Sequence, residues 1–264
     1  DCLQLLKERG MNTIRLRVFV NPSQDKASGH CSKEETVAMA LRAQKAKMRI
    51  MIDFHYSDTW ADPAKQAKPA AWVNLSFDAL QNKVYEHTFD VLTALQKAGV
   101  TPEWVQVGNE IPGGMLWPDG STNNWAQLAQ LLNKGYEATK AVNAKIKVIV
   151  HVDEGNNNEK FRCFFDKATE HQVKYDVIGL SYYPFWIKKD YSETMADLQK
   201  NLNDMASRYQ KEVMVVEVGG VDEQVQNTRE LLAATIKAVR AVPDHKGLGV
   251  LYWEPQGAKS WSGY

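Results

Sequence analysis

Short apolar runs alternate with longer segments of helical periodicity along nearly the whole chain. Several short runs, such as residues 148–150 and 213–216, are continuously apolar, as in the strands of a parallel sheet that helices cover. The predicted strands are residues 13–20, 49–54, 104–108, 146–151, 177–182, 212–218 and 247–253. The predicted helices are residues 2–10, 33–47, 77–97, 125–142, 159–171, 195–209 and 225–242, the second of them opening with a Ser32/Glu35 capping box.

This alternation predicts an α/β fold of the (β/α)8 TIM barrel type. A helix precedes the first predicted strand and none follows the last. We therefore expect a barrel whose first strand lies before Asp1 and whose last helix follows Tyr264, with residues 1–264 forming one catalytic domain. A doubly wound open sheet is the alternative, but it usually carries a glycine-rich turn after an early strand, and no such turn occurs here.

Composition narrows the range of partners. The 264 residues include 32 basic and 32 acidic side chains, so the formal charge is zero, which argues against nucleic acid or an anionic membrane as a partner. No apolar stretch approaches the roughly 20 residues that span a bilayer. No signal peptide opens the chain, which starts inside a predicted helix, so we expect the natural N-terminus to be missing. Three scattered cysteines are too few for a disulfide framework or a zinc site.

Two glutamates stand where buried strands run out. Glu110 follows the run at 104–108, and Glu217 ends the run at 213–216. Burying a carboxylate there is costly unless something compensates, so two such acids call for an explanation. Paired carboxylates at neighbouring strand ends are the equipment of glycoside hydrolysis, one as proton donor and one as nucleophile or base. Each acid alone could equally be a structural member of an ion pair.

Polar and aromatic residues also follow the other predicted strands. The carboxyl ends of barrel strands meet at one mouth, where the chemistry of this fold takes place. The residues at these ends are Arg15, Arg17, Asp53, His55, Trp60, Asn109, His151, Asp153, Ser181, Tyr183, Trp253 and Glu254. Their convergence is difficult to explain by packing alone, although a single histidine is more often structural than catalytic.

The position of Arg15 indicates which glutamate is the nucleophile and which is the proton donor. A guanidinium inside a barrel must be paired, and the obvious partner is a carboxylate at the same mouth. An arginine beside Glu217 would keep that carboxylate ionised, as a nucleophile requires. Glu110, in a less positive place, would have a raised pKa and act as the proton donor.

Metal-dependent hydrolysis is the rival chemistry for such a barrel. It usually shows closely spaced ligands such as His-x-His or His-Glu-x-x-His, and the nearest approach here is Asp53-Phe54-His55. No ligand ladder of the EF-hand type occurs, so a bound calcium ion would be structural. We therefore expect no required cofactor and no catalytic metal.

Six stretches resemble glycoside hydrolase family 53, the endo-β-1,4-galactanases, within the clan of retaining (β/α)8 glycosidases. They are residues 10–18 (GMNTIRLRV), 52–63 (IDFHYSDTWADP), 107–111 (VGNEI), 179–185 (GLSYYPF), 215–217 (VVE) and 252–255 (YWEP). The resemblance covers nearly the whole chain. The stretch 52–63 is the most specific, whereas the pair Asn109-Glu110 marks only the clan.

The resemblance also implies roles for individual residues. Glu110 would be the acid/base and Glu217 the nucleophile, with Arg15 and Tyr183 orienting Glu217. Asn109 would bind the 2-hydroxyl of the cleaved sugar. The residues lining the same subsite would be Asp53, His55, His151 and Trp253, and those at outer subsites would be Trp60, Asp153, Trp117 and Trp186.

The implied activity is endo-hydrolysis of β-1,4-galactan, the side chain of type I arabinogalactan in pectin, by double displacement. No cofactor is implied, and the compact stretch 217–247 argues against the calcium loop that some family members carry there. We expect a monomer that meets its polymer outside the cell or at the cell surface. The alternatives are a mannanase or cellulase of the same clan, a non-catalytic galactan-binding barrel and a metal-dependent hydrolase.

Overall fold

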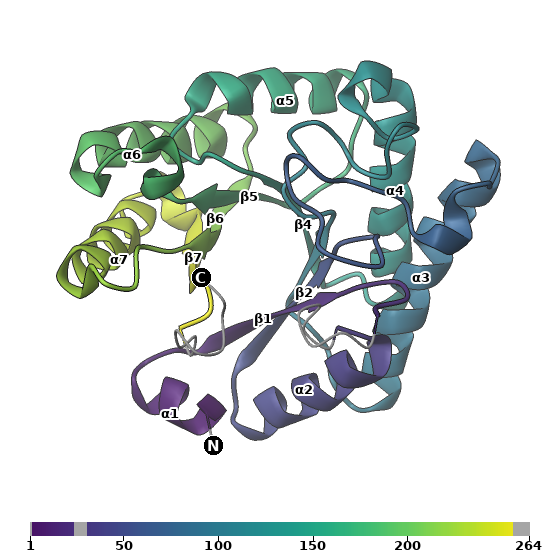
Figure 1. Cartoon of the computed structure of the whole chain (residues 1–264), viewed down its shortest axis with the longest axis horizontal. Coiled ribbons are helices and arrows are strands. Elements are labelled where there is room, and N and C mark those ends of the chain that lie inside the picture. Colours follow the sequence, from purple (N-terminus) through teal and green to yellow (C-terminus); the bar gives the residue numbers. More distant parts are fainter. Residues whose placement is uncertain (1, 24–30, 256–264) are drawn as a thin grey trace.

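The computed structural model describes residues 2–23 and 31–255, which fold around one seven-stranded sheet whose strands lie in sequence order (Figure 1). Every neighbouring pair of strands is parallel. The strands are β1 (Thr13–Val18), β2 (Arg49–Phe54), β3 (Trp104–Val107), β4 (Lys147–Val152), β5 (Val177–Tyr182), β6 (Glu212–Val218) and β7 (Gly247–Tyr252).

Helices cover the outer face of this sheet, which curls into an incomplete barrel with β1 and β7 as its edges (Figure 1). The α-helices are α1 (Cys2–Glu8), α2 (Lys33–Lys45), α3 (Phe77–Lys97), α4 (Trp125–Val142), α5 (Asn158–Glu170), α6 (Tyr191–Arg208) and α7 (Val225–Arg240). Short 3₁₀ turns are η2 (Ala70–Trp72), η3 (Thr122–Asn124), η4 (Pro184–Ile187) and η5 (Pro243–His245). The predicted α/β barrel class is confirmed.

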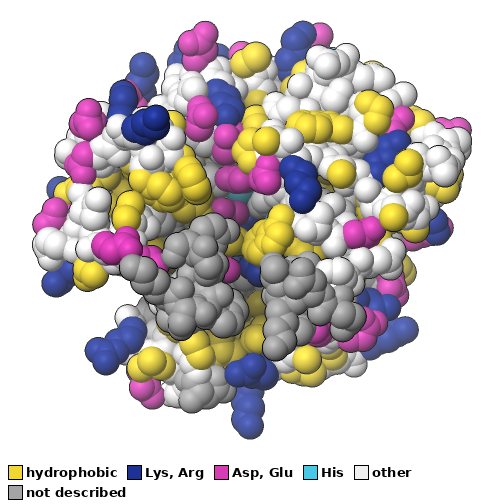
Figure 2. All heavy atoms as spheres, in the orientation of Figure 1, with side chains coloured by type: hydrophobic (Ala, Val, Ile, Leu, Met, Phe, Trp, Pro, Cys, Tyr) yellow, Lys and Arg dark blue, Asp and Glu magenta, His cyan; other side chains and the backbone are white. Residues whose placement is uncertain are grey.

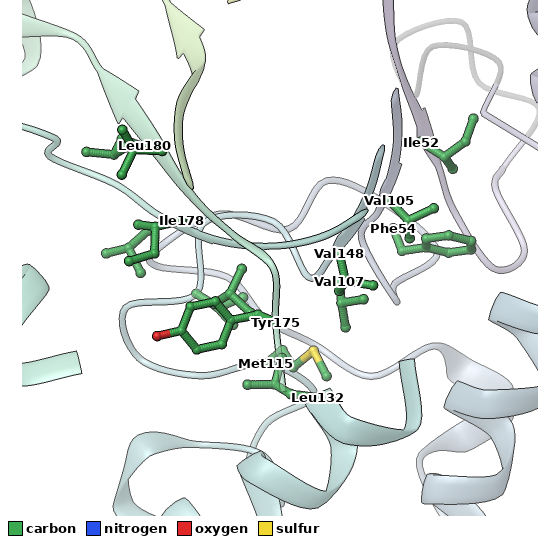
Figure 3. Packing of buried hydrophobic residues seen from close by; sticks show 14 of the residues in the cluster. Ile52, Phe54, Val105, Val107, Met115, Leu132, Val148, Tyr175, Ile178 and Leu180 are labelled. Carbon is green, nitrogen blue, oxygen red and sulfur yellow. The ribbon is translucent and has the colours of Figure 1, made fainter. Parts of the chain in front are cut away.

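The apolar core has two layers because side chains alternate across each strand. Outward-facing residues such as Ile52, Phe54, Val105 and Val107 pack against the helices (Figure 3). A smaller cluster fills the barrel interior below the polar mouth. Its buried members are Met51, Trp104, Ile149, Val177, Met214 and Val216.

Capping residues decide where two of the helices begin. The predicted capping box of Ser32 and Glu35 opens α2. Helix α6 begins at Tyr191, earlier than the predicted residue 195, because Asp190 and Glu193 form a second capping box. The apolar periodicity of this helix starts later than its backbone hydrogen bonding, which explains the difference.

His87 of α3 lies among the rings of Phe54, Tyr56 and Trp72, and its Nε2 atom has no hydrogen-bond partner in the described part of the chain. Burial lowers the pKa of His87 from 6.5 to about 4. Between these two pH values His87 is therefore protonated in the unfolded chain but neutral in the native protein. The free energy of unfolding should fall as the pH is lowered through this window, by at most about 1.4 kcal/mol per pH unit from this residue.

The variant His87→Phe should lose this contribution, so its urea midpoint should fall less between pH 7 and pH 4.5 than that of the wild type. His171→Phe is the control, because His171 stacks against Trp125 at the end of α5, away from the cluster around His87. Equal pH dependence in the wild type and in His87→Phe would contradict the assignment.

Candidate active site

The polar residues predicted at the strand ends meet at the mouth of the barrel. Figure 2 shows acidic side chains around a hollow at the centre of this face, with a histidine visible within it. Glu110 follows β3 and Glu217 lies in β6, so the two side chains approach the hollow from different strands of the sheet. The two glutamates therefore share one site.

Arg15 of β1 is the cation at the floor of this site. Its Nη1 atom lies 2.9 Å from Oε1 of Glu217, and its Nη2 atom lies 2.9 Å from Oδ2 of Asp53. The same Nη2 donates to Oδ1 of Asn109 at 2.8 Å. Burial opposes the charge of Arg15, but the two carboxylates outweigh it and raise the pKa of the guanidinium. The predicted pairing of Arg15 with a carboxylate at the mouth is confirmed.

A β-bulge in β6 turns Glu217 toward Arg15. In the pairing with β5, Leu180 lies opposite Val215 and Ser181 lies opposite Glu217, which leaves Val216 as an extra residue. Val216 packs in the barrel interior, and Glu217 reaches the interior as well. Strict alternation would have sent Glu217 outward after an inward Val216, so the bulge re-aims this side chain.

Glu217 is held by two donors. Besides Arg15, the hydroxyl of Tyr183 donates to its Oε2 at 2.9 Å. Burial raises the pKa of Glu217, and the charge of Arg15 and the hydrogen bond from Tyr183 offset only part of that rise, so the pKa stays above its usual value. Burial and the neighbouring Glu217 raise the pKa of Tyr183 well above its usual value, so the phenol keeps its proton and remains a donor. Arg15 and Tyr183 thus orient Glu217 and favour its carboxylate form against the effect of burial.

Glu110 lies in a different electrostatic environment. Gly108 and Glu110 have φ angles of +82° and +43°, so the chain turns sharply as it leaves β3. No arginine or lysine in the described ranges forms an ion pair with Glu110 at the distances seen for Glu217. Burial, followed by the charge of Glu217, raises the pKa of Glu110 to about 8. Glu110 therefore carries a proton at neutral pH while Glu217 has its own cation.

His151 and Ser181 form a chain of hydrogen bonds around Glu110. The backbone N–H of Glu110 donates to Nδ1 of His151 at 3.2 Å, so the ring proton is on Nε2, which lies 2.7 Å from Oγ of Ser181. Burial, helped by Arg15, holds the pKa of His151 well below its usual value, and the ring stays neutral. The hydroxyl of Ser181 accepts the Nε2–H of His151 and also forms a hydrogen bond with Glu110. That second bond lowers the pKa of Glu110 and so offsets part of the rise that burial causes.

Asp53 forms the second ion pair of Arg15, and His55 in turn donates a hydrogen bond to Asp53. Nδ1 of His55 accepts the backbone N–H of Ala61 at 2.9 Å, so its Nε2–H donates to Oδ2 of Asp53 at 3.0 Å. Gln106 donates to Oδ1 of Asp53 at 2.6 Å. Burial alone would raise the pKa of Asp53, but Arg15 and His55 outweigh it and the pKa is lowered. Asp53 is a fixed anion that holds the guanidinium in place.

Asn109 links Arg15 to the loop that follows β2. Its Nδ2 donates to the carbonyl oxygen of Ala61 at 2.7 Å, and its Oδ1 accepts from Arg15. Among the described residues, Nδ2 donates to this one acceptor, so its second hydrogen can reach a substrate hydroxyl. This geometry is compatible with the predicted contact to a sugar hydroxyl.

The four predicted tryptophans have different surroundings. Trp60 and Trp253 lie together, with ring centroids 5.9 Å apart, and the Arg17 guanidinium lies 3.9 Å from the centre of the Trp60 ring. Trp186 on η4 is 69% exposed. Trp117 is tied into its own loop, since its Nε1–H donates to the carbonyl oxygen of Gly113 at 2.9 Å.

Asp153 lies beside Lys160, whose Nζ is 2.7 Å from the carboxylate. Burial raises the pKa of Asp153, and Lys160 offsets part of the rise. The predicted candidates thus include residues around the two glutamates, the aromatic pair Trp60 and Trp253, and residues farther out such as Trp117, Asp153 and Trp186.

Gln106 is a site residue that was not among the sequence-based candidates, and Ser181 and Arg17 stood among the strand-end residues without a role of their own. Gln106 and Ser181 occupy inward positions of β3 and β5, and an uncharged polar residue within an otherwise apolar strand was the available signal. The stacking of Arg17 on Trp60 depends on a loop that the strand pattern does not place.

Within residues 2–23 and 31–255, no group of three or more histidine, cysteine, aspartate or glutamate side chains is arranged to hold a metal ion. In the same ranges no helix is both long and apolar enough to cross a membrane.

The model of glycosyl hydrolase family 53 matches residues 1–262. The chain belongs to this family. It is 36% identical to the arabinogalactan endo-β-1,4-galactanase of Thermothelomyces thermophilus over 95% of this chain and 80% of that protein. An uncharacterised protein of Niallia circulans is 38% identical over 97% of this chain and 76% of its own length.

Solved structures of family 53 agree with this assignment. A fungal β-1,4-galactanase superposes with a TM-score of 0.86 at 34% identity, covering 96% of this chain and 80% of that one. The catalytic domain of the Ignisphaera aggregans family 53 enzyme gives 0.85 at 34% identity, covering 96% and 76%. A family 10 xylanase from Bispora sp., at 13% identity and a TM-score of 0.62, covers 86% and 69% and shares the fold alone. The chain is a family 53 glycoside hydrolase.

Proposed function

We propose that this glycoside hydrolase cleaves β-1,4-galactan, the side chain of type I arabinogalactan, at internal bonds by a retaining mechanism. Relatives from Thermothelomyces thermophilus and Humicola insolens carry the name arabinogalactan endo-β-1,4-galactanase. The observation that carries the mechanism is the difference in surroundings between Glu217 and Glu110. Burial raises the pKa of both acids, but Glu217 is paired with Arg15 and accepts from Tyr183, whereas the pKa of Glu110 reaches about 8.

In the first step, a carboxylate oxygen of Glu217 attacks the anomeric carbon while Glu110 gives its proton to the departing glycosidic oxygen. The bond from sugar to leaving group breaks, and an ester between Glu217 and the sugar forms. Glu110, now a carboxylate, then takes a proton from water, which attacks the same carbon and releases the sugar with its original configuration. Arg15 and Tyr183 keep the Glu217 carboxylate in position throughout.

We also propose that the enzyme needs no metal or organic cofactor, acts as a monomer and works outside the cell or at the cell surface. The ion pairs that already engage Asp53 and Asp153 support the absence of a catalytic metal. The polymeric substrate supports the location, because a long galactan chain does not cross a membrane.

A polysaccharide panel tests the substrate. Potato galactan, mannan and carboxymethylcellulose are incubated with the enzyme, with and without EDTA, and the released oligosaccharides are sized. We expect galacto-oligosaccharides of several lengths from galactan alone, unchanged by EDTA. Release from mannan or cellulose in place of galactan, binding to galactan without release, or loss of activity with EDTA would each contradict the proposal.

Ser181 provides a test of Glu110 as the acid. The rate should fall as the pH rises through about 8, because the acid must be protonated. Ser181→Ala removes a hydrogen bond that lowers the pKa of Glu110, so the alkaline limb of kcat/KM should move up by about one pH unit. Ser181→Thr keeps a hydroxyl and should leave the limb in place. An unmoved limb in Ser181→Ala would show that the hydroxyl does not act on the acid.

A further inference from the structure

A groove of about 610 Å³ lies on the same face as the catalytic mouth, between the first turns of α5 and the middle of α6. The β4–α5 loop and the end of η4 complete its walls. Both segments follow the carboxyl end of a strand, which places the groove at the rim of the mouth. Its volume falls in the range of ligand sites.

The base of this α5–α6 groove is held rigidly. Asn158 at the start of α5 donates to Oδ1 of Asn201 and Oδ2 of Asp204, both at 2.9 Å. Arg162 forms a two-pronged pair with Asp204 at 2.7 and 2.8 Å. The two helices are thereby fixed to each other, so a ligand would meet a preorganised surface.

Several polar side chains that line the groove have no partner among the described residues. Asn156, Asp197 and Lys200 form no side-chain hydrogen bond or ion pair with any residue in the described part of the chain. Asp197 and Lys200 are one turn apart on α6 with opposite charges, a spacing at which such pairs commonly form, yet they stay separate. These donors and acceptors are free to bind a ligand.

The charges of the lining indicate what kind of ligand would fit. Three acidic side chains, Glu154, Glu159 and Asp197, stand against three basic ones, Arg162, Lys189 and Lys200. This balance gives no attraction for an anionic polymer such as nucleic acid. Amide, carboxylate and ammonium groups together match the mixed donors and acceptors of a neutral chain of sugars.

Two connections join the groove to the catalytic centre. Glu154 in its wall directly follows Asp153, whose charge contributes to the raised pKa of Glu110. On the other side, Tyr183, which holds Glu217, contacts Phe185 at 5.8 Å between ring centroids, and Phe185 contacts Trp186 at 4.7 Å. Exposed Trp186 immediately precedes Ile187 of the groove wall and offers a flat face to a sugar ring.

We propose that the α5–α6 groove binds sugar units of the galactan chain beyond the catalytic mouth, so that the enzyme holds a long polymer more tightly than a short fragment. This inference rests on the proposed galactanase function. It assigns Asn156, Asp197 and Lys200 to polymer binding and gives them no part in bond cleavage.

The test compares two double variants on two substrates. Asp197→Ala/Lys200→Ala removes one acid and one base from the groove. Lys167→Ala/Glu170→Ala is the matched control, an oppositely charged pair with the same spacing at the far end of α5, outside the groove. We measure kcat/KM on long β-1,4-galactan and on galactotetraose, together with retardation by galactan in native gels.

We expect the groove variant to lose about tenfold in kcat/KM on the polymer, equivalent to about 1.4 kcal/mol, mainly through KM. Its rate on galactotetraose should stay within about twofold of the wild type, and its gel retardation should weaken. The control should match the wild type in all three assays. Equal effects of the groove variant on polymer and tetraose, or no effect on either, would overturn the inference. A wild type that cleaves neither substrate would instead refute the galactanase function, and this inference with it.

Discussion

Replacing Glu217 with alanine should reduce the hydrolysis of β-1,4-galactan by about 10⁴-fold or more, because removing the nucleophile removes the covalent route. The fold should survive. Removal of this buried carboxylate leaves Arg15 still paired with Asp53 at 2.9 Å, and Tyr183 loses only an acceptor. The rate of reducing-sugar release and the thermal unfolding midpoint measure these two effects separately.

Azide distinguishes a missing nucleophile from a damaged site. The small anion can enter the space left by the Glu217 side chain and attack the anomeric carbon, so it should restore part of the activity of Glu217→Ala on an activated aryl galactoside and form a galactosyl azide. The matched variant Glu212→Ala, at the other end of β6 and paired with Lys147, should keep nearly full activity without azide. Normal galactan hydrolysis by Glu217→Ala would exclude the nucleophile role.

Replacing Arg15 with methionine should produce the largest combined loss of stability and activity. The change removes the ion pairs that Arg15 forms with two buried carboxylates, Asp53 and Glu217. Breaking a buried pair in this way typically costs about 3–5 kcal/mol, because a charge is left uncompensated. Without Arg15 the pKa of Glu217 should rise further, so a larger fraction is protonated at neutral pH and the nucleophile is lost.

Urea unfolding and kcat on galactan measure both parts of this prediction. Arg49→Met is the control, since Arg49 pairs with a half-exposed Glu103 at the opposite end of the barrel, where such pairs contribute at most about 1 kcal/mol. If Arg15→Met were as stable and as active as Arg49→Met, Arg15 would not be the cation on which the site depends.

Much of the fold follows from local patterns in the sequence. Short apolar-rich runs located each strand to within about two residues, and the Ser32 capping box located the start of α2. Apolar periodicity alone predicts the start of α6 too late, because the Asp190/Glu193 capping box begins the helix before its apolar pattern does. The pairing of Arg15 was predictable because an unpaired guanidinium is too costly to bury.

Other parts of the site depend on geometry that spacing does not reveal. The bulge at Val216 turns Glu217 inward, and only the register between β5 and β6 shows it. Gln106 and Ser181 are ordinary polar residues in a sequence, and their importance appears once Asp53 and His151 are seen beside them. Trp117 and Asp153 were predicted as outer subsites, and the structure shows Trp117 held by Gly113 of its own loop and Asp153 by Lys160 of α5.

The central claim is that Glu110 and Glu217 hydrolyse β-1,4-galactan by two displacements. Proton NMR of the wild-type enzyme acting on galactan tests it most directly, because the anomeric signal of the first new reducing ends reports the stereochemistry before mutarotation. Two displacements predict that the β-anomer appears first and the α-anomer grows in later. Initial appearance of the α-anomer would contradict the account.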